Sequence, residues 1–319
     1  MQHPNTPLER QLVSILAANR EGAYGTQRAR SGNLARAGRA LQERFGLQKW
    51  ANLGAKHVAF LVEKWKAEDT RRRSIDAQLT HFRWLVRKLG KANLMPRENR
   101  ELGVEPGPRY TRAGKFVLQE RLLEILGGVA DDPRRRMAVL FGRYFGLRIR
   151  EAMLFRPWRD WEESGRIWVK RGTKGGRPRY LFLWNPRQRE ILEEARALVH
   201  GQDAALIPEE AATWEQWRQA SYHKLRKAGM SKETDTVFHD LRRTWAGERM
   251  HYLIKVRGLD PEHAERIVTR ELGHSRREVL RWYLEDLDLI VAEESHTRRP
   301  AAPGRDENGD CHSVRGKNE

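Results

Sequence analysis

The sequence predicts a mainly α-helical protein with a small antiparallel β-sheet, divided into two domains. Three observations lead to this prediction: apolar residues recur at one-turn spacing over most of the chain, a stretch rich in Pro and Gly interrupts them near residue 100, and two short β-prone runs flank a glycine-rich turn. We expect a helical domain over residues 1–105, a second domain over 112–295, and a disordered tail over 296–319.

The first domain is predicted to be a bundle of about four helices. Its first 30 residues have the apolar spacing of one short helix only, whereas the helical period is strong from Gly32 to Lys91. Between Asn93 and Arg112, repeated Pro and Gly residues disfavour both helix and strand, so we expect a linker there.

In the second domain, Asp132 followed by Pro133 is typical of a helix N-cap with proline at the first helical position. A β-hairpin is predicted next, with strands at Arg166–Lys170 and Arg179–Leu183 and a turn at 173–176. Helical patterns then continue to about Val291.

Composition indicates a polyanionic partner. The 61 Lys and Arg residues exceed the 43 Asp and Glu residues, which leaves a formal net charge of +18, and this excess is most often found in proteins that bind nucleic acid. Residues 1–110 alone hold 21 basic and 10 acidic residues. We therefore expect the basic side chains of this region to face DNA rather than only solvent, in particular Arg71, Arg72, Arg73, Arg83, Arg87 and Lys88.

The remaining composition points to a reducing compartment. The sequence contains one Cys and no apolar run of the length of a membrane helix, and its N-terminus has no apolar signal core. We expect a cytoplasmic, nucleoid-associated bacterial protein without disulfides or a thiolate metal cluster.

The second domain contains the residue types that metal-independent cleavage of a phosphodiester requires. Arginine holds phosphate oxygens in a bidentate manner, histidine carries protons near neutral pH, and an activated tyrosine can be the nucleophile. The candidates are Arg148, Lys174, His239, Arg242, His274 and Tyr283, and we expect no metal or other cofactor.

Each candidate also has an ordinary structural explanation. The arginines could lie on the surface, Lys174 could be a solvated turn residue, and Tyr283 could be a core residue of an amphipathic helix. Context favours function for the arginines, because Arg148 follows a glycine at a helix break and Arg242 lies one turn from His239. A zinc site would need a third His or Cys at ligand spacing, and a nucleotide-binding loop at 173–176 would need further glycine and Ser/Thr residues.

Taken in order, these residues resemble the tyrosine recombinase, or phage integrase, family. The run Gly146–Ala152 is similar to the first-arginine box, with Arg148 at the catalytic position and Glu151 as its supporting acid. Lys174 corresponds to the hairpin lysine, 239–244 to the His-x-x-Arg box, and Leu272–His274 with Tyr283 to the last box. The resemblance covers about 115–292 specifically and 30–105 more loosely. Arg150 departs from it, because a small residue is common at that position.

The resemblance implies a C-shaped DNA clamp made of a helical core-binding domain and a tyrosine-recombinase catalytic domain. Tyr283 would attack the scissile phosphate to form a 3′-phosphotyrosine, with Lys174 protonating the leaving 5′ oxygen and His239 accepting a proton. Arg148, Arg242 and His274 would hold the phosphate. The expected assembly is a homotetramer on two double-stranded DNA sites, with neighbours in contact near 287–291 and possible accessory bending or directionality factors. The segment before residue 30 is too short for a separate arm-binding domain.

Site-specific recombination, for integration or excision of a mobile genetic element, is the function that the resemblance implies. A type IB topoisomerase-like enzyme would use the same chemistry without a partner site. A catalytically silent DNA-binding regulator would not need Tyr283, and a basic structural or RNA-binding protein would not need the ordered motifs at all.

Overall fold

The computed structural model describes residues 6–105, 116–162, 164–208, 213–231, 233–234 and 236–273. The chain divides into two compact units, Met1–Thr111 and Arg112–Glu319, which are described separately. No helix within the described residues is long and apolar enough to cross a membrane.

Unit 1 is a bundle of α-helices. Its helices are α1 (Pro7–Ala18), α2 (Tyr24–Phe45), α3 (Ala55–Ala67) and α4 (Arg72–Lys88), with 3-10 turns between α2 and α3 at Trp50–Asn52 and after α4 at Ala92–Leu94 and Asn99–Leu102. A capping box starts α1: the Thr6 hydroxyl accepts from the Glu9 backbone N–H, and the Glu9 carboxylate accepts from that of Thr6, both at 3.1 Å.

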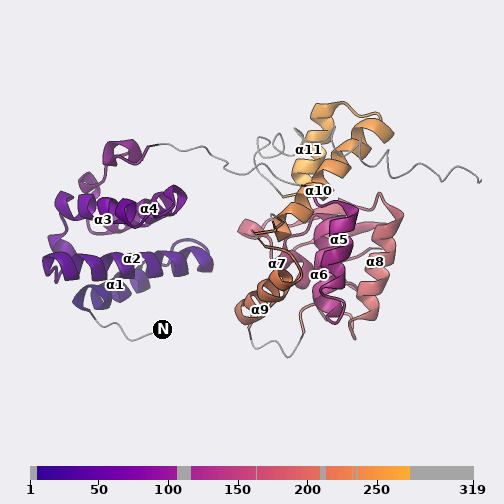
Figure 1. Cartoon of the computed structure of the whole chain (residues 1–319), viewed down its shortest axis with the longest axis horizontal. Helices are drawn as coiled ribbons and strands as arrows, with labels where there is room; N and C mark the ends of the chain where they lie inside the picture. Colours follow the sequence, from indigo (N-terminus) through magenta and orange to yellow (C-terminus); the bar gives the residue numbers. More distant parts are fainter. Residues whose placement is uncertain are drawn as a thin grey trace, which may run out of the picture. The chain divides into compact units, whose positions relative to one another are not determined.

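The long helix α2 is the centre of unit 1, with α1 on one side and α3 and α4 on the other (Figure 1). It begins at Tyr24, eight residues before the predicted start at Gly32. Its residue Gly38 allows close packing, because a β-carbon there would lie 3.1 Å from the ring of Trp50. That tryptophan is 1% exposed, and its indole N–H donates to the carbonyl of Leu8 at 2.9 Å.

The predicted linker is wrong in its first half. Residues up to Val104 fold onto unit 1, where Met95 and Val104 are buried in the core. The guanidinium group of Arg83 also binds this segment, since its Nε and Nη2 donate to the carbonyl of Pro96 at 3.1 and 3.0 Å. Proline and glycine residues end the helical periodicity of the sequence here, but the chain continues to pack on the core of unit 1 up to Val104.

Unit 2 has seven α-helices and one β-hairpin in its described part. The helices are α5 (Gln119–Gly127), α6 (Pro133–Phe145), α7 (Ile149–Met153), α8 (Pro186–Ala197), α9 (Trp214–Lys227), α10 (Phe238–His251) and α11 (Pro261–Glu271), and a π-helical turn at Tyr252–Val256 follows α10. Strands β1 (Arg166–Val169) and β2 (Arg179–Phe182) pair antiparallel, with Arg166 opposite Phe182. The predicted hairpin and helix cap are both present, and Asp132 accepts from the Arg135 backbone N–H at 3.0 Å.

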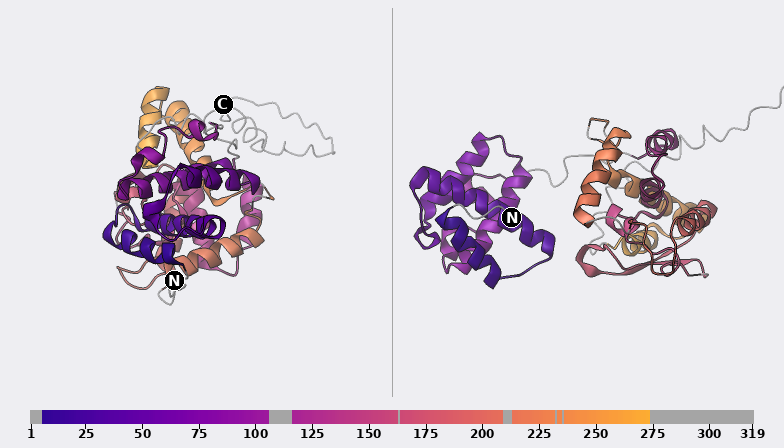
Figure 2. Two further views of the ribbon diagram at one scale, coloured as in Figure 1. Left: turned by 90° about the vertical axis from the view of Figure 1, so that its left-hand side faces the viewer. Right: turned by 90° about the horizontal axis from the view of Figure 1, so that it is seen from below.

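Helices α6 and α10 make the most extensive helix–helix contact in the described part of unit 2. At Gly142, a β-carbon would lie 3.0 Å from Phe238 of α10. Helix α6 ends at Gly146, whose φ of 61° requires the left-handed conformation, and a β-carbon there would collide with Trp245 at 2.4 Å. Both α5 and α6 stand upright in Figure 1 and are seen end-on in the right-hand view of Figure 2.

The predicted fold class, mainly helical with a small antiparallel sheet, is confirmed. The C-shaped arrangement of the two units around DNA stays a prediction.

Candidate active site

The turn at Gly146 places Arg148 directly before α7 and Glu151 in its first turn. The Glu151 carboxylate accepts from the backbone N–H of Arg148 at 2.9 Å and from its Nη1 at 2.7 Å. Glu151 is 1% exposed, whereas the side chain of Arg148 keeps 23% of its surface. This side chain is therefore held by a buried acid and remains accessible from outside.

Helix α10 brings Arg242 to the same carboxylate from almost a hundred residues away. Its Nη1 lies 3.6 Å from the Glu151 Oε2. Its two terminal nitrogens also donate to the carbonyls of Gly146 and Leu272, and its side chain is only 1% exposed. The structure thus brings together both predicted arginines and the predicted supporting acid.

A third arginine, which sequence reasoning did not single out, completes this cluster. Arg179 of β2 donates to both oxygens of Glu151 at 3.0 and 2.8 Å, and its Nε donates to the carbonyl of Glu271 at 2.5 Å. Burial alternates along β2, with Arg179 and Leu181 pointing inward. An arginine at an inward strand position needs a buried partner, and that pattern is the signal that could have identified it.

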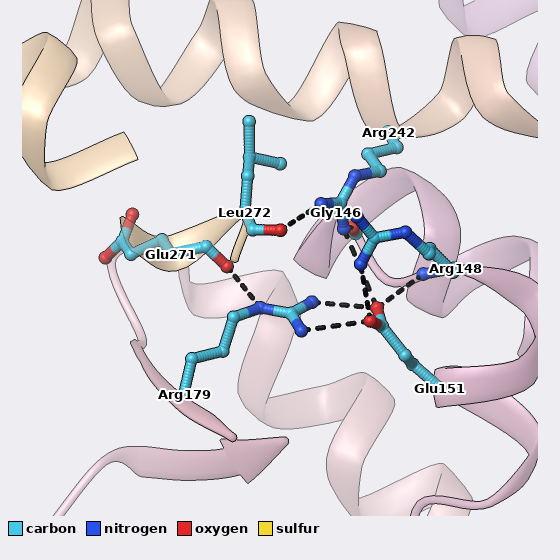
Figure 3. A network of polar contacts seen from close by, with 7 residues as sticks. All are labelled: Gly146, Arg148, Glu151, Arg179, Arg242, Glu271 and Leu272. Carbon is cyan, nitrogen blue, oxygen red and sulfur yellow. Dashed lines mark hydrogen bonds and ion pairs between the residues drawn. The ribbon is translucent and has the colours of Figure 1, made fainter. Parts of the chain in front are cut away.

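Figure 3 shows the resulting arrangement, in which the guanidinium groups of Arg148, Arg179 and Arg242 surround a single carboxylate. Burial by itself raises the pKa of Glu151, but the hydrogen bonds and charge of Arg179 and the charges of Arg242 and Arg148 outweigh it and lower that pKa to about 2. Glu151 is therefore ionised at neutral pH. The three guanidinium groups and the one carboxylate together leave an excess of positive charge, which attracts an anion.

His239 lies on α10, one turn before Arg242. Its pKa is lowered to about 4 by desolvation and by the charges of Arg242, Arg243 and Arg148. The imidazole is therefore neutral at pH 7, and the residue keeps exposed surface. A neutral histidine beside an anion site can accept a proton.

Lys174 stands at the turn of the hairpin, in the 3-10 segment Lys174–Gly176, and is exposed. Within the described residues, no hydrogen bond or ion pair joins it to the arginine cluster. His274 and Tyr283 lie outside the described residues, as do the predicted contact segment 287–291 and the tail 296–319. The last described residue, Gly273, adjoins His274 and has a φ of 64°.

The basic residues predicted to face DNA in unit 1 differ in how they are placed on and around α4. Arg71, Arg73, Arg87 and Lys88 are exposed, whereas Arg72 and Arg83 are half-buried. Lys88 pairs with Glu21, and Arg72 with Asp76 at 3.5 Å. The Nε of Arg87 donates to the carbonyl of Arg83 at 3.2 Å, and contact of all six residues with DNA stays a prediction.

Arg150, where the sequence departs from the family pattern, lies at the edge of the site. Its guanidinium carbon lies 5.7 Å from the ring centroid of Trp214 in α9. Its backbone approaches Gly172 so closely that a β-carbon at Gly172 would lie 2.7 Å from the Arg150 carbonyl oxygen. The larger side chain is thus accommodated by an aromatic contact outside the arginine cluster.

No group of three or more His, Cys, Asp or Glu side chains that could hold a metal ion occurs in the part of the chain that the structure describes.

Comparison with known proteins gives two family matches. The integrase family model matches residues 111–248, and the model for the N-terminal domain of phage integrases matches residues 6–95. The integrase match includes Arg148, Lys174, His239 and Arg242, whereas His274 and Tyr283 lie beyond its end. A sequence search among curated proteins gave no match.

Several solved structures share the fold. A lambda integrase tetramer bound to a Holliday junction aligns with a TM-score of 0.61 at 14% identity, covering 88% of this chain and 78% of the other. The XerH site-specific recombinase bound to a palindromic difH substrate aligns at 0.56, with 16% identity over 90% and 84% of the two chains. The Tn1549 transposon integrase (residues 82–397) aligns at 0.54, with 13% identity over 91% and 99%.

Proposed function

The chain belongs to the phage integrase family of tyrosine-type site-specific DNA recombinases, and we propose that it integrates or excises a mobile genetic element. Two family matches carry the assignment to recombination, one in each structural unit. The arginine cluster around Glu151 is the observation that supports catalysis by this chain, because it provides a cationic phosphate site at the positions where the family's motifs occur.

In the proposed reaction, the hydroxyl of Tyr283 attacks the scissile phosphorus, so that a Tyr283 Oη–P bond forms and the bond from phosphorus to the 5′ oxygen breaks. Lys174 gives a proton to the departing 5′ oxygen, and His239 accepts the proton of the tyrosine hydroxyl. The 5′-hydroxyl of a partner strand then attacks the 3′-phosphotyrosine, which reverses the bond changes and reseals the DNA. No external energy source is needed, since one phosphoester is exchanged for another.

The geometry supports several of these roles. Arg148 is accessible and preorganised by Glu151, so it can hold non-bridging phosphate oxygens without losing much entropy. The lowered pKa of His239 keeps the ring unprotonated, as a proton acceptor must be. Lys174, on an exposed hairpin turn, is available to a bound DNA backbone.

Arg242 takes part in holding the site together as well as in binding phosphate. It joins α10 to the Gly146 turn and to the end of α11 through two carbonyls. Its charge lies beside that of Arg148, within reach of the same carboxylate. We assign phosphate binding to Arg148 and Arg242 together with His274.

We also propose the assembly and setting. Lambda integrase forms a tetramer on a Holliday junction, and by likeness this chain would act as a homotetramer on two double-stranded DNA sites. Contacts between neighbours near 287–291 and accessory bending or directionality factors are part of this proposal, as is a location in the bacterial cytoplasm, associated with the nucleoid.

Replacement of the nucleophile tests the proposed function. Tyr283→Phe should bind DNA as the parent does but form no covalent adduct, because only the hydroxyl is removed. The measurement is a denaturing gel with a nicked suicide substrate, on which the parent should show a protein–DNA adduct. An adduct formed by the Phe variant would contradict the assignment.

Sequencing DNA fragments trapped by the parent would identify the target, and trapping without sequence preference would favour a relaxing topoisomerase.

A further inference from the structure

Arg179 connects three parts of the site through a guanidinium group that the protein itself binds on every nitrogen. Its side chain is 6% exposed, and its guanidinium group is bound on both sides, to the Glu151 carboxylate and to the Glu271 carbonyl. Its three guanidinium nitrogens all donate to groups of the protein, so its role in the site depends on the residues that it holds.

The first of these is Glu151. Arg179 binds this carboxylate at two points, at 3.0 and 2.8 Å, while Arg148 contacts it at 2.7 Å and Arg242 lies 3.6 Å away. A bidentate guanidinium contact sets the plane of the carboxylate as well as its position. The carboxylate so oriented accepts the hydrogen bond of Arg148 and faces the charge of Arg242.

The second connection runs to the end of α11. The Arg179 Nε donates to the carbonyl of Glu271, and the carboxylate of Glu271 is held by Arg249 at 2.9 and 2.8 Å. Gly273 leaves room for this contact: a β-carbon there would lie 3.2 Å from the Arg179 Cδ, and the φ of 64° also favours glycine. The segment that Arg179 holds leads directly into His274.

The third connection is the hairpin itself. Arg179 is the first residue of β2, five positions after Lys174, and pairs in register with Val169 of β1. The Lys174 turn is thereby tied to the arginine cluster through one buried side chain.

We propose that Arg179 is a positioning residue for DNA cleavage, which aligns Glu151 with its two other arginines and fixes the Lys174 hairpin and the α11 end relative to them. This inference rests on the proposed function. The full-length protein with Arg179→Met should cleave a saturating suicide substrate roughly 10²-fold more slowly, which is the cost of displacing catalytic groups by about an ångström. Arg179→Lys should recover part of the rate, because it keeps a charge near Glu151 without the bidentate geometry.

Arg143 provides a matched control for simple loss of stability. It is similarly buried, with 8% of its side chain exposed, and binds Glu248 of α10 at two points, but it does not contact Glu151. Arg143→Met should lower Tm as much as Arg179→Met does, yet it should retain cleavage within a few-fold of the parent. The dissociation constant for DNA should change little in either variant.

A double-substitution cycle with Glu151→Gln adds a second measurement. If Arg179 acts through Glu151, the two substitutions together should slow cleavage by much less than the product of their separate effects. If the parent is active, two results would overturn the positioning role and leave the proposed function standing. One is that Arg143→Met slows cleavage as much as Arg179→Met does, and the other is that Arg179→Met cleaves at the parent rate. If the parent protein binds DNA but never forms the covalent adduct, the proposed function is wrong, and the positioning role is wrong with it.

Discussion

The two units use arginine in opposite ways. In unit 1, Arg73 and Arg87 of α4 are exposed, and the ion pair of Lys64 with Glu68, at 2.7 Å, lies on the surface. In unit 2, Arg179 and Arg242 are buried against the carboxylate of Glu151, and Arg249 is buried against Glu271. The exposed charges of unit 1 are available to an anionic partner, whereas the buried arginines of unit 2 form the candidate active site.

Physical chemistry explains why this difference matters. An exposed ion pair contributes little to stability and is screened by salt, so the loss of one surface cation should have a graded effect on affinity. A buried charge must have its partners in good geometry, because removing one partner leaves the other desolvated without compensation. Substitutions in the arginine cluster around Glu151 should therefore affect the reaction sharply, whereas those of exposed arginines in unit 1 should change DNA binding gradually.

Lys174 is the exception within unit 2, since it is an exposed cation predicted to act in chemistry. Lys174→Ala should slow cleavage by ~10²–10⁴-fold, the usual contribution of a general acid. A substrate with a 5′-bridging phosphorothiolate should restore the rate, because a thiolate leaves without needing a proton. The measurement is the single-turnover cleavage rate on both substrates. An equal defect on the two would make Lys174 a phosphate contact instead.

Arg148 and Arg242 test the requirement for geometry directly. Replacement of either by Lys keeps the charge but removes the planar fork, and cleavage should slow by ~10²–10³-fold. Arg73→Lys on α4 is the control, and it should cleave at nearly the parent rate. The rate of covalent adduct formation at saturating DNA distinguishes them. Near-normal cleavage by either site variant would mean that its charge alone is sufficient.

The exposed arginines in and directly before α4 test the predicted clamp. With Arg71, Arg73 and Arg87 all changed to Gln, the log–log slope of affinity against salt should become shallower by roughly 0.9 for each phosphate that is no longer neutralised. Cleavage at saturating DNA should remain. Lys64→Gln is the control, because Lys64 lies on α3, outside the set of residues predicted to contact DNA. A fluorescence anisotropy titration at several salt concentrations gives the slope, and an unchanged slope would exclude the C-shaped clamp.

The smallest effect concerns His239 and the pH dependence of stability. Its pKa is lowered to about 4 in the folded chain, against about 6.5 in an unfolded chain. Between these values the unfolded chain binds more protons, so stability should fall as the pH is lowered from about 6.5 toward 4. His239→Gln should therefore show a weaker fall of Tm over this range. An identical pH profile for parent and variant would contradict the lowered pKa.

Local patterns predicted much of the fold. The Asp132 cap, the hairpin and its turn, and the helix break at Gly146 follow from residue preferences over a few positions. The predicted start of α2 and the first half of the predicted linker were both wrong, for the same reason. Polar, Gly- and Pro-containing stretches can pack against a neighbouring core, as residues up to Val104 do, and local periodicity does not report that packing.

The residues of the candidate site were likewise predicted only in part from the sequence. Arg148, Glu151 and Arg242 were identified from sequence motifs, and the structure brings these three together. Their catalytic roles, and those of Lys174, His239, His274 and Tyr283, stay predictions that the experiments above test. Arg179 was not identified, because it belongs to no recognised motif and its importance depends on partners 28 and 92 residues away in sequence.

The sequence by itself determined the residue types of the site, their order along the chain and the short elements that carry them, since these depend on local propensities and motif spacing. Only the tertiary structure decided that one buried carboxylate would organise three arginines, from the N-cap of α7, from β2 and from α10. The physical reason is that the strength of a buried ion pair depends on distance, desolvation and bidentate geometry. Those quantities exist only once distant segments have packed together.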